Sequence, residues 1–349
     1  MKKNWSTIIF LSGIIFCSCQ KGNNSPPSNT PVDVYVAGYE ANNANNNVAK
    51  YWKNGAPYVL SDGLYPAVAT SVYISGNDVY ISGYESNAAG NNVAGYWENG
   101  TKVILGDGTI NTTAWSIVVS NNDVYVAGAS YDSSVGISKA IYWKNGTPFY
   151  LDSASNYGGA YRIAVSGTDV YVAGNDDYGN AVYWKNGNIM ILQGNALVRS
   201  MVISGNDVYI TGIVLPPTGV RAKVKARIWI NGSVPTYLSD NANATYGEGI
   251  AISGNDIYVA GFSVDGTGNH PVYWKNDSIN YLPSNGTGPG AIGLGAAGAI
   301  SAFGNDIYIA GEDGSATNKI AAYWKNGKLV DLTDGSHNAE SLAIFISKQ

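Results

Sequence analysis

The chain has 349 residues and a formal net charge of −5, with 43 glycines, 26 tyrosines and only 13% charged residues. Strand and turn residues dominate and strong helix formers are scarce, which argues against a helical bundle or an α/β fold. The 45% hydrophobic content is too high for a disordered chain. The weakly acidic balance argues against a nucleic-acid partner, which would require a basic face.

The N-terminus has the organisation of an export signal. Two lysines precede a mostly apolar run ending at Phe16, which is too short for a permanent transmembrane helix. Ser18-Cys19 resembles the lipobox of bacterial lipoproteins, in which a small residue precedes the lipidated cysteine. We therefore expect residues 1–18 to be a lipoprotein signal peptide, Cys19 to carry the lipid, and residues 19–32 to be a disordered tether at a bacterial cell envelope. An ordinary signal peptide is the alternative.

One unit recurs seven times after this segment. Each copy opens with a hexapeptide related to Asp-Val-Tyr-Val-Ala-Gly, and successive copies are 45, 45, 46, 38, 49 and 50 residues apart. The copies begin at Asp33, Asp78, Asp123, Asp169, Asp207, Asp256 and Asp306. A Tyr-Trp or Ile-Trp marker follows in every unit, at Trp52, Trp97, Trp143, Trp184, Trp229, Trp274 and Trp324. Self-similarity at this period predicts a repeat architecture.

Each unit contains two tight hairpins. Gly-Asn before the hexapeptide suits a type II′ turn, and Asn-Gly after the Tyr-Trp marker suits a type I′ turn. The unit thus has four short strands, named A to D in chain order, with the hexapeptide as strand B. Because strand B is apolar at consecutive positions, both faces of its sheet must be covered. We predict an all-β, seven-bladed β-propeller with four antiparallel strands per blade over residues 33–349. A long array of separate modules is the rival.

The two ends of the repeat region complement each other. The first unit has no strand A before Asp33, and the chain ends with Ser341–Ser347, a strand A that no strand B follows. We expect this C-terminal strand to become the innermost strand of the blade that carries Asp33–Gly38. That pairing would close the ring and remove two sheet edges.

The unit resembles the repeat of bacterial seven-bladed propellers, whose hallmark is Gly-Asn before a Tyr-Val-x-Gly strand, as at Gly254. Its strand order is similar to that of kelch and WD40 repeats. The paired glycine of kelch is single here, at Gly38, and the Trp-Asp of WD40 is replaced by Trp52-Lys53. The resemblance implies a propeller with a binding role, and it transfers no catalytic residue.

Alternate connections in such a blade lie on the same side of the ring. The Gly-Asn and Asn-Gly turns therefore share one face, the short-turn face. The long and variable B–C and D–A connections share the opposite one, the long-loop face. Variable loops on a rigid scaffold usually carry function. We expect the long-loop face, near the central channel, to bind a glycan, peptide or protein partner.

Residues that enter strand A should lie closest to the channel. Aligned on the Gly-Asn turn, six units place different residues at one position: Thr70, Trp115, Tyr161, Arg199, Glu248 and Gly298. The candidate ligand-binding residues are Trp115, Tyr161, Arg199 and Glu248, with Tyr65, Tyr157, Tyr246 and His337 just upstream. Aromatic planes beside a few polar groups suit sugars or peptides. The alternative is that these side chains plug the channel or cover blade edges.

The sequence offers little catalytic or metal-binding chemistry. Its two histidines fall in different units, and no His or Cys pair has metal-ligand spacing. The acidic pairs Asp176-Asp177 and Glu312-Asp313 could bind Ca²⁺, but we expect them to be solvated turn residues instead. We therefore expect a monomeric, non-catalytic binding protein with no cofactor and no metal. The alternative is a propeller enzyme, a lyase or glycoside hydrolase, with its site at the channel mouth.

Overall fold

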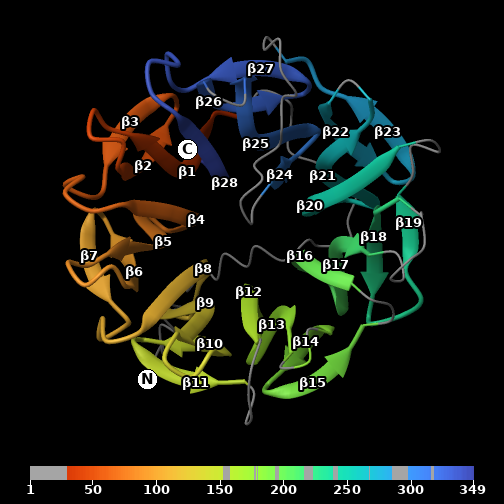
Figure 1. The fold of residues 1–349 in the computed structure, drawn as a ribbon. Helices are drawn as coiled ribbons and strands as arrows, with labels where there is room; N and C mark the ends of the chain where they lie inside the picture. The colour runs from red at the N-terminus through yellow and green to blue at the C-terminus, as the bar shows by residue number, and fades with distance from the viewer. Residues whose placement is uncertain are drawn as a thin grey trace, which may run out of the picture.

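The computed structural model describes residues 30–151, 158–176, 178, 180–192, 196–215, 223–238, 243–266, 268–284, 298–315 and 318–349. Seven four-stranded antiparallel sheets stand as blades around a central axis (Figure 1), so the chain is a seven-bladed β-propeller. The predicted signal peptide, Cys19 and nearly all of the predicted tether lie outside the described residues. Within the described ranges, no helix has the length and apolar character needed to span a membrane.

Every blade runs from an innermost strand A to an outermost strand D. Blade 1 consists of β28 (Ala339–Lys348), β1 (Val32–Ala41), β2 (Asn47–Lys53) and β3 (Ala56–Val59). Blade 2 consists of β4 (Ala67–Ser75), β5 (Asp78–Ser86), β6 (Asn92–Glu98) and β7 (Thr101–Ile104). Blade 3 consists of β8 (Asn111–Ser120), β9 (Asp123–Asp132), β10 (Ile137–Lys144) and β11 (Thr147–Tyr150). Blade 4 consists of β12 (Gly159–Ser166), β13 (Asp169–Asn175), β14 (Ala181–Lys185) and β15 (Asn188–Ile191).

The remaining blades follow the same order around the ring. Blade 5 consists of β16 (Ala196–Ser204), β17 (Asp207–Val214), β18 (Lys225–Ile230) and β19 (Thr236–Leu238). Blade 6 consists of β20 (Ala244–Ser253), β21 (Asp256–Val264), β22 (Asn269–Lys275) and β23 (Ser278–Tyr281). Blade 7 consists of β24 (Ala299–Phe303), β25 (Asp306–Ser315), β26 (Asn318–Lys325) and β27 (Lys328–Asp331).

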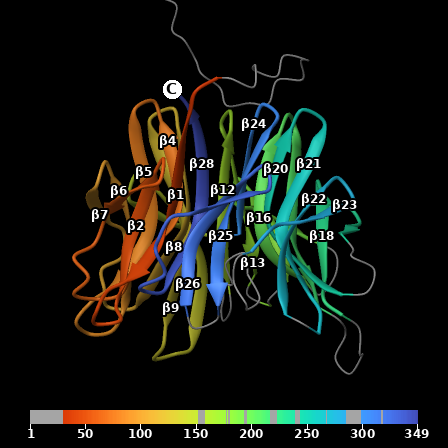
Figure 2. The same cartoon turned by 90° about the horizontal axis from the view of Figure 1, so that it is seen from above.

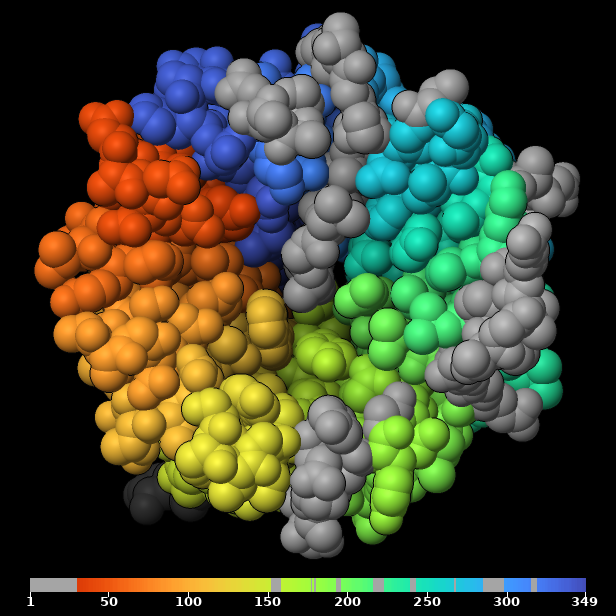
Figure 3. Space-filling model, in the orientation of Figure 1, coloured from red at the N-terminus to blue at the C-terminus, as the bar shows by residue number. Residues whose placement is uncertain are grey.

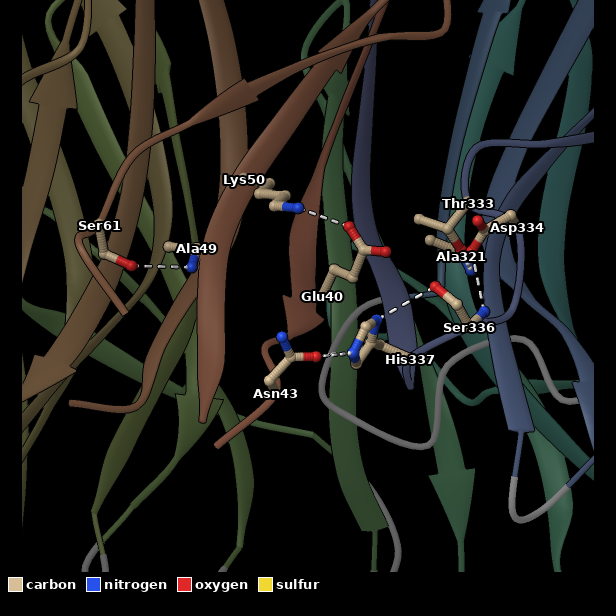
Figure 4. A network of polar contacts seen from close by, with 10 residues as sticks. All are labelled: Glu40, Asn43, Ala49, Lys50, Ser61, Ala321, Thr333, Asp334, Ser336 and His337. Carbon is tan, nitrogen blue, oxygen red and sulfur yellow. Dashed lines mark hydrogen bonds and ion pairs between the residues drawn. The ribbon is translucent and has the colours of Figure 1, made fainter. Parts of the chain in front are cut away.

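The predicted ring closure is confirmed. Strand β28 pairs antiparallel with β1, from Val32 opposite Lys348 to Glu40 opposite Ala339, and is longer at both ends than predicted. On the long-loop side, His337 Nε2 lies 2.9 Å from Asn43 Oδ1 (Figure 4), which ties the turn before β28 to the turn after β1. The first and last of the described strands thus share one blade.

Side chains on both faces of strand B fill the spaces between blades. Val34 and Val36 pack with Trp52 against blade 7, whereas Tyr35 and Ala37 pack against blade 2. One such apolar cluster lies at each of the seven blade interfaces, and each contains one repeat tryptophan, at most 2% exposed. The repeat tryptophans therefore pack between blades.

An asparagine clamp recurs on the short-turn face. Asn54 has a φ of 52°, its Oδ1 accepts a hydrogen bond from Val34 N at 2.9 Å, and its Nδ2 donates to Asp33 Oδ1 at 2.8 Å. The same pair of bonds is made in the other blades by Asn99, Asn145, Asn186, Asn231, Asn276 and Asn326. One residue type therefore supplies both the positive φ of the turn and the bond to strand B.

The B–C connection of blade 1 on the long-loop face is a tight turn, because β1 continues to Ala41 and β2 begins at Asn47. Asn42 Oδ1 accepts two backbone N–H groups of that turn, and Asn42 Nδ2 donates to Gly63 O at 3.0 Å in the D–A connection. Figure 2 shows the tight A–B hairpins along one edge of the ring and these connections along the opposite edge.

Candidate ligand-binding site at the channel mouth

A β-bulge interrupts the innermost strand of six blades at one equivalent position. In blade 5, Val198 pairs with Gly212 and Ser200 with Thr211, which leaves Arg199 outside the ladder. The residues skipped in this way are Thr70, Trp115, Tyr161, Arg199, Glu248 and Leu342. Bulges bend a strand and re-aim a side chain. The variable position found by alignment is therefore a bulge position, a feature that the sequence did not reveal.

The glycine that ends the hexapeptide makes room for the bulge. A Cβ on Gly128 would lie 1.9 Å from the carbonyl oxygen of Thr113, two residues before the bulged Trp115. The same backbone clash, at 1.8–2.1 Å, would arise at the equivalent glycines of five more blades, Gly38, Gly83, Gly174, Gly212 and Gly261. Since Cβ atoms do not approach a backbone oxygen so closely, the recurring glycine and the bulge belong to one structural device.

Two arginines and a glutamate meet where blades 4, 5 and 6 adjoin. Arg199 Nε on β16 lies 3.4 Å from Glu248 Oε2 on β20, and the Arg199 side chain is 31% exposed. Arg162, the residue after the bulge in β12, donates from Nη1 to the Tyr161 carbonyl at 2.8 Å. Burial raises the pKa of Glu248 to about 7, although Arg199 and Arg162 oppose this rise. Burial also lowers the pKa of Arg162 to about 10, against the attraction of Glu248.

A second charged cluster lies across blades 7 and 1. Lys319 Nζ on β26 is 3.0 Å from Glu312 Oε2 on β25 and also pairs with Glu340 on β28. Burial raises the pKa of Glu312 to about 7, and the negative charge of Glu340 adds to this effect. The pKa of the Tyr39 hydroxyl is raised, first by burial and then by Glu340. This cluster therefore holds two carboxyl groups around one lysine.

Aromatic side chains continue the mouth on blades 1 to 3. Trp115 meets Tyr84 edge to face, with ring centroids 6.0 Å apart and an interplanar angle of 71°. Tyr84 and Tyr39 pack against buried Val68 and Leu342. The mouth is thus aromatic on one side of the ring and has the arginine cluster on the blades that follow. Figure 3 shows a molecular surface that is hollowed toward the centre of the ring.

The comparisons with known proteins give only architecture. No protein-family model matches the chain, and no curated protein matches its sequence. It is similar to a Mycobacterium tuberculosis puromycin-hydrolyzing peptidase at 11% identity, over 78% of this chain and 53% of that one, with a TM-score of 0.49. It is also similar to a Pyrococcus horikoshii acylaminoacyl peptidase at 13% identity, over 87% of this chain and 50% of that one, with a TM-score of 0.48. The polysaccharide lyase Uly1 is similar at 10% identity, over 94% of both chains, with a TM-score of 0.48.

The likeness is one of fold. The chain spans about half the length of the two peptidases that it matches. At such low identity and TM-score, none of these structures assigns an activity or a site to the propeller. The functional argument therefore depends on its own channel mouth.

Four of the predicted site residues lie at bulge positions: Trp115, Tyr161, Arg199 and Glu248. Tyr246 stacks on Phe262 across β20 and β21, with ring centroids 4.4 Å apart, and forms part of the blade wall. Tyr65 is half-buried in the turn between β3 and β4.

His337 and Tyr157, the other two predicted upstream residues, are not placed in the charged or aromatic clusters of the mouth. His337 bonds to Asn43, and its Nδ1 lies 3.1 Å from Ser336 Oγ, so it fastens the closure between blades 7 and 1 (Figure 4). Tyr157 lies outside the described residues. The structure therefore brings Arg199 and Glu248 into direct contact and leaves His337 in a separate network.

The expectation of solvated acidic turns is wrong for three of the four residues. Glu312 and Asp313 are 5% and 2% exposed, because β25 continues past Gly311 to Ser315. Asp176 is 5% exposed, and its Oδ1 accepts hydrogen bonds from the backbone N of Tyr178 and of Asn180. Asp177 lies outside the described residues. Within the described ranges, no group of three or more His, Cys, Asp or Glu side chains could hold a metal ion.

Sequence reasoning missed several residues of the mouth, namely Arg162, Tyr39, Tyr84, Lys319 and Glu340. A signal for two of them was present, because Tyr39 and Tyr84 directly follow the glycine of the hexapeptide. That position varies between units as the bulge position does: Tyr39, Tyr84, Ala129, Asn175, Ile213, Phe262 and Glu312. A second variable position therefore marks the same end of the blades.

Proposed function

We propose that this protein is a lipid-anchored recognition protein of a bacterial cell envelope. In this proposal it binds a glycan, peptide or protein at the channel mouth of the long-loop face, without catalysis. The observation that carries the proposal is the ring of β-bulges, in which one backbone device presents a different side chain in each of six blades. Repetition of backbone with variation of side chain is typical of a scaffold that carries a binding site.

Partial exposure favours a binding site over a plug. Trp115 and Tyr161 are half-buried and the Arg199 side chain is 31% exposed, whereas the repeat tryptophans are at most 2% exposed. Rings and a guanidinium in this state present apolar area and hydrogen-bond donors to an incoming molecule. These groups suit a sugar best among the three ligand classes, since a sugar has both apolar ring faces and many hydroxyl groups.

The binding proposal is tested with the full-length protein on arrays of glycans and peptides. Trp115→Ala should weaken binding of any ligand that is found, and Phe149→Ala on the outer strand β11 is the matched aromatic control. Phe149 is 41% exposed at the rim of blade 3, so its removal should leave binding unchanged. Equal effects of the two substitutions would contradict a site at the mouth.

The anchor is tested separately. Cys19→Ser should release the protein from the membrane fraction into the soluble fraction, whereas Cys17→Ser should leave it membrane-bound. Membrane association that survives the Cys19 substitution would contradict the lipid anchor and would leave the binding proposal intact.

The competing proposal is a propeller enzyme of the lyase or glycoside hydrolase type. It is favoured by Glu248 and Glu312, two buried carboxyl groups whose pKa values are both raised to about 7. Such a carboxyl group is suited to general acid catalysis near neutral pH. Turnover of a polysaccharide by the natural protein, lost in Glu248→Gln or Glu312→Gln, would replace the binding proposal with this one.

A further inference from the structure

We infer that Arg162 and Arg199 form a binding site for the carboxylate of an acidic sugar, and that Glu248 competes with that carboxylate for the two guanidinium groups. The inference rests on the proposed function and narrows it, since it names the chemical class of the ligand. It depends on the meeting of β12, β16 and β20, the innermost strands of three neighbouring blades (Figure 1).

The first argument is the charge of the cluster. Two guanidinium groups face one carboxylate, so the cluster carries a net positive charge even when Glu248 is ionised. A positive excess close to a buried carboxylate is costly to maintain unless another anion can approach it. An acidic ligand would supply the second negative charge.

The second argument is an unsatisfied donor. Arg199 Nε is buried and has no hydrogen-bond acceptor among the described residues. Its 3.4 Å separation from Glu248 Oε2 is longer than the roughly 2.7–2.9 Å of a good charge-assisted hydrogen bond. A buried donor without an acceptor is unfavourable, so a better-placed carboxylate that accepts a hydrogen bond from this guanidinium would be stabilised.

The third argument is access and support. The Arg199 side chain is 31% exposed, so a ligand can reach its planar fork, which matches the two oxygens of a carboxylate. Arg162 is half-buried, and its bond to the Tyr161 carbonyl holds the guanidinium beside the bulge. Arg199 would therefore contact the ligand directly, and Arg162 would add positive charge beneath it.

The aromatic bulge residues favour a sugar over a peptide as the source of the carboxylate. Tyr161 on β12 is close enough to Arg199 for the arginine charge to act on its pKa, and Trp115 occupies the next bulge along the ring. The Tyr161 ring beside this anion site suits the apolar face of a pyranose whose acid group reaches the arginine. A carboxylate on a flexible peptide side chain would gain less from a fixed ring.

Glu248 makes the site sensitive to pH. The charged groups that face its carboxyl group are Arg199 on β16 and Arg162 on β12. When Glu248 ionises it occupies the same guanidinium groups that the ligand needs. Affinity for an acidic sugar should therefore fall as the pH rises from 6 to 8, and Glu248→Gln should abolish that decrease.

The experiment measures binding to the full-length protein by isothermal titration calorimetry, with trigalacturonate, neutral galactotriose and triglutamate as probes. Trigalacturonate should bind more tightly than galactotriose, by about tenfold or more. Arg199→Gln should weaken the binding of trigalacturonate by about tenfold or more. Arg227→Gln is the matched control, because Arg227 lies in the same blade but its guanidinium stacks on Tyr237 of the outer strand at 3.7 Å. Thermal unfolding confirms that each variant is folded.

Each outcome decides between the claims. Equal affinity for trigalacturonate and galactotriose, or affinity for trigalacturonate unchanged by Arg199→Gln, would overturn the acidic-sugar site but leave a glycan-binding protein. Tighter binding of triglutamate than of trigalacturonate would overturn it in favour of an acidic peptide. Binding of none of the three probes at pH 6 would also overturn it, and the arrays described above then decide whether the proposed function survives.

Discussion

The short-turn face and the channel mouth are built from the same seven units in opposite ways. On the short-turn face, seven asparagines make the same two hydrogen bonds, so sequence and geometry repeat together. At the mouth, six bulges repeat the backbone while the side chain changes from threonine to tryptophan to glutamate. In a repeat protein, a position whose geometry repeats but whose residue does not is therefore the place to look for a ligand.

Blade 3 allows the sharpest test of this contrast, because it has both a repeat tryptophan, Trp143, and a tryptophan at the bulge position, Trp115. Trp143→Ala should lower the free energy of unfolding by about 3–5 kcal/mol, since it empties a buried site between blades 2 and 3. Trp115→Ala at the bulge should cost about 1 kcal/mol, because its side chain is already half-exposed. Urea unfolding of both variants measures the difference. Equal losses would mean that Trp115 is a structural plug.

The pH dependence of stability tests the buried acids of the mouth. The folded-state pKa of Glu248 is about 7, against 4.5 for the ordinary group, so the folded protein binds the proton more tightly than the unfolded chain. Stability from this group is complete below pH 4.5 and is lost as the pH rises to 7, by on the order of 3 kcal/mol. Glu248→Gln should reduce this loss in urea unfolding at pH 5 and pH 8. Glu312 should account for the remainder.

Asp33 on the short-turn face should have the opposite pH dependence. Its bonds to Lys53 and Asn54 lower its pKa to about 2. Its contribution is therefore present above pH 3.8 and lost as the pH falls toward 2, and solvent exposure keeps it small. Asp33→Asn should flatten the acid limb of the stability profile and leave the neutral limb unchanged. An altered neutral limb would show that the two faces are energetically coupled.

Loss of the asparagine clamp should lower the free energy of unfolding by less than Trp143→Ala and by more than Asp33→Asn. Asn54→Ala loses two hydrogen bonds and puts a Cβ-bearing residue at a φ of 52°, which together cost about 2 kcal/mol. Asn54→Gly keeps the turn conformation and loses only the bonds, so its cost should be about half as large. Thermal unfolding separates the two contributions. A glycine variant as unstable as the alanine variant would assign the whole effect to the side chain.

The fold could be predicted in detail because its determinants are local and repeated. The consecutive apolar residues of strand B, Val34 to Ala37, indicated that both faces are covered, and the unpaired segment after Ser341 indicated the closure. The candidate site could be located only as a position in the alignment. Neither a bulge nor a contact between Arg199 and Glu248 can be inferred from one strand. The bulge depends on the paired strand of the same blade, and the contact depends on how neighbouring blades pack.

The errors have the same physical origin. The sequence predicts a solvated turn for Glu312 and Asp313, because charged residues after a glycine are typical of loops. The structure buries them because β25 extends beyond that glycine and Lys319 approaches from the adjacent strand. A charged residue at a strand end can thus be interpreted only when its partner on another strand is known.

The pairing of β28 with β1 joins two segments that are translated far apart in time. Strand β1 leaves the ribosome long before its inner neighbour, which follows the strands of the other six blades. Until then blade 1 has three strands, and the inner edge of β1 stays open to pairing with another chain. A stop codon before Ala339 would make that state permanent. Only a chain that extends through β28 covers the inner edge of β1.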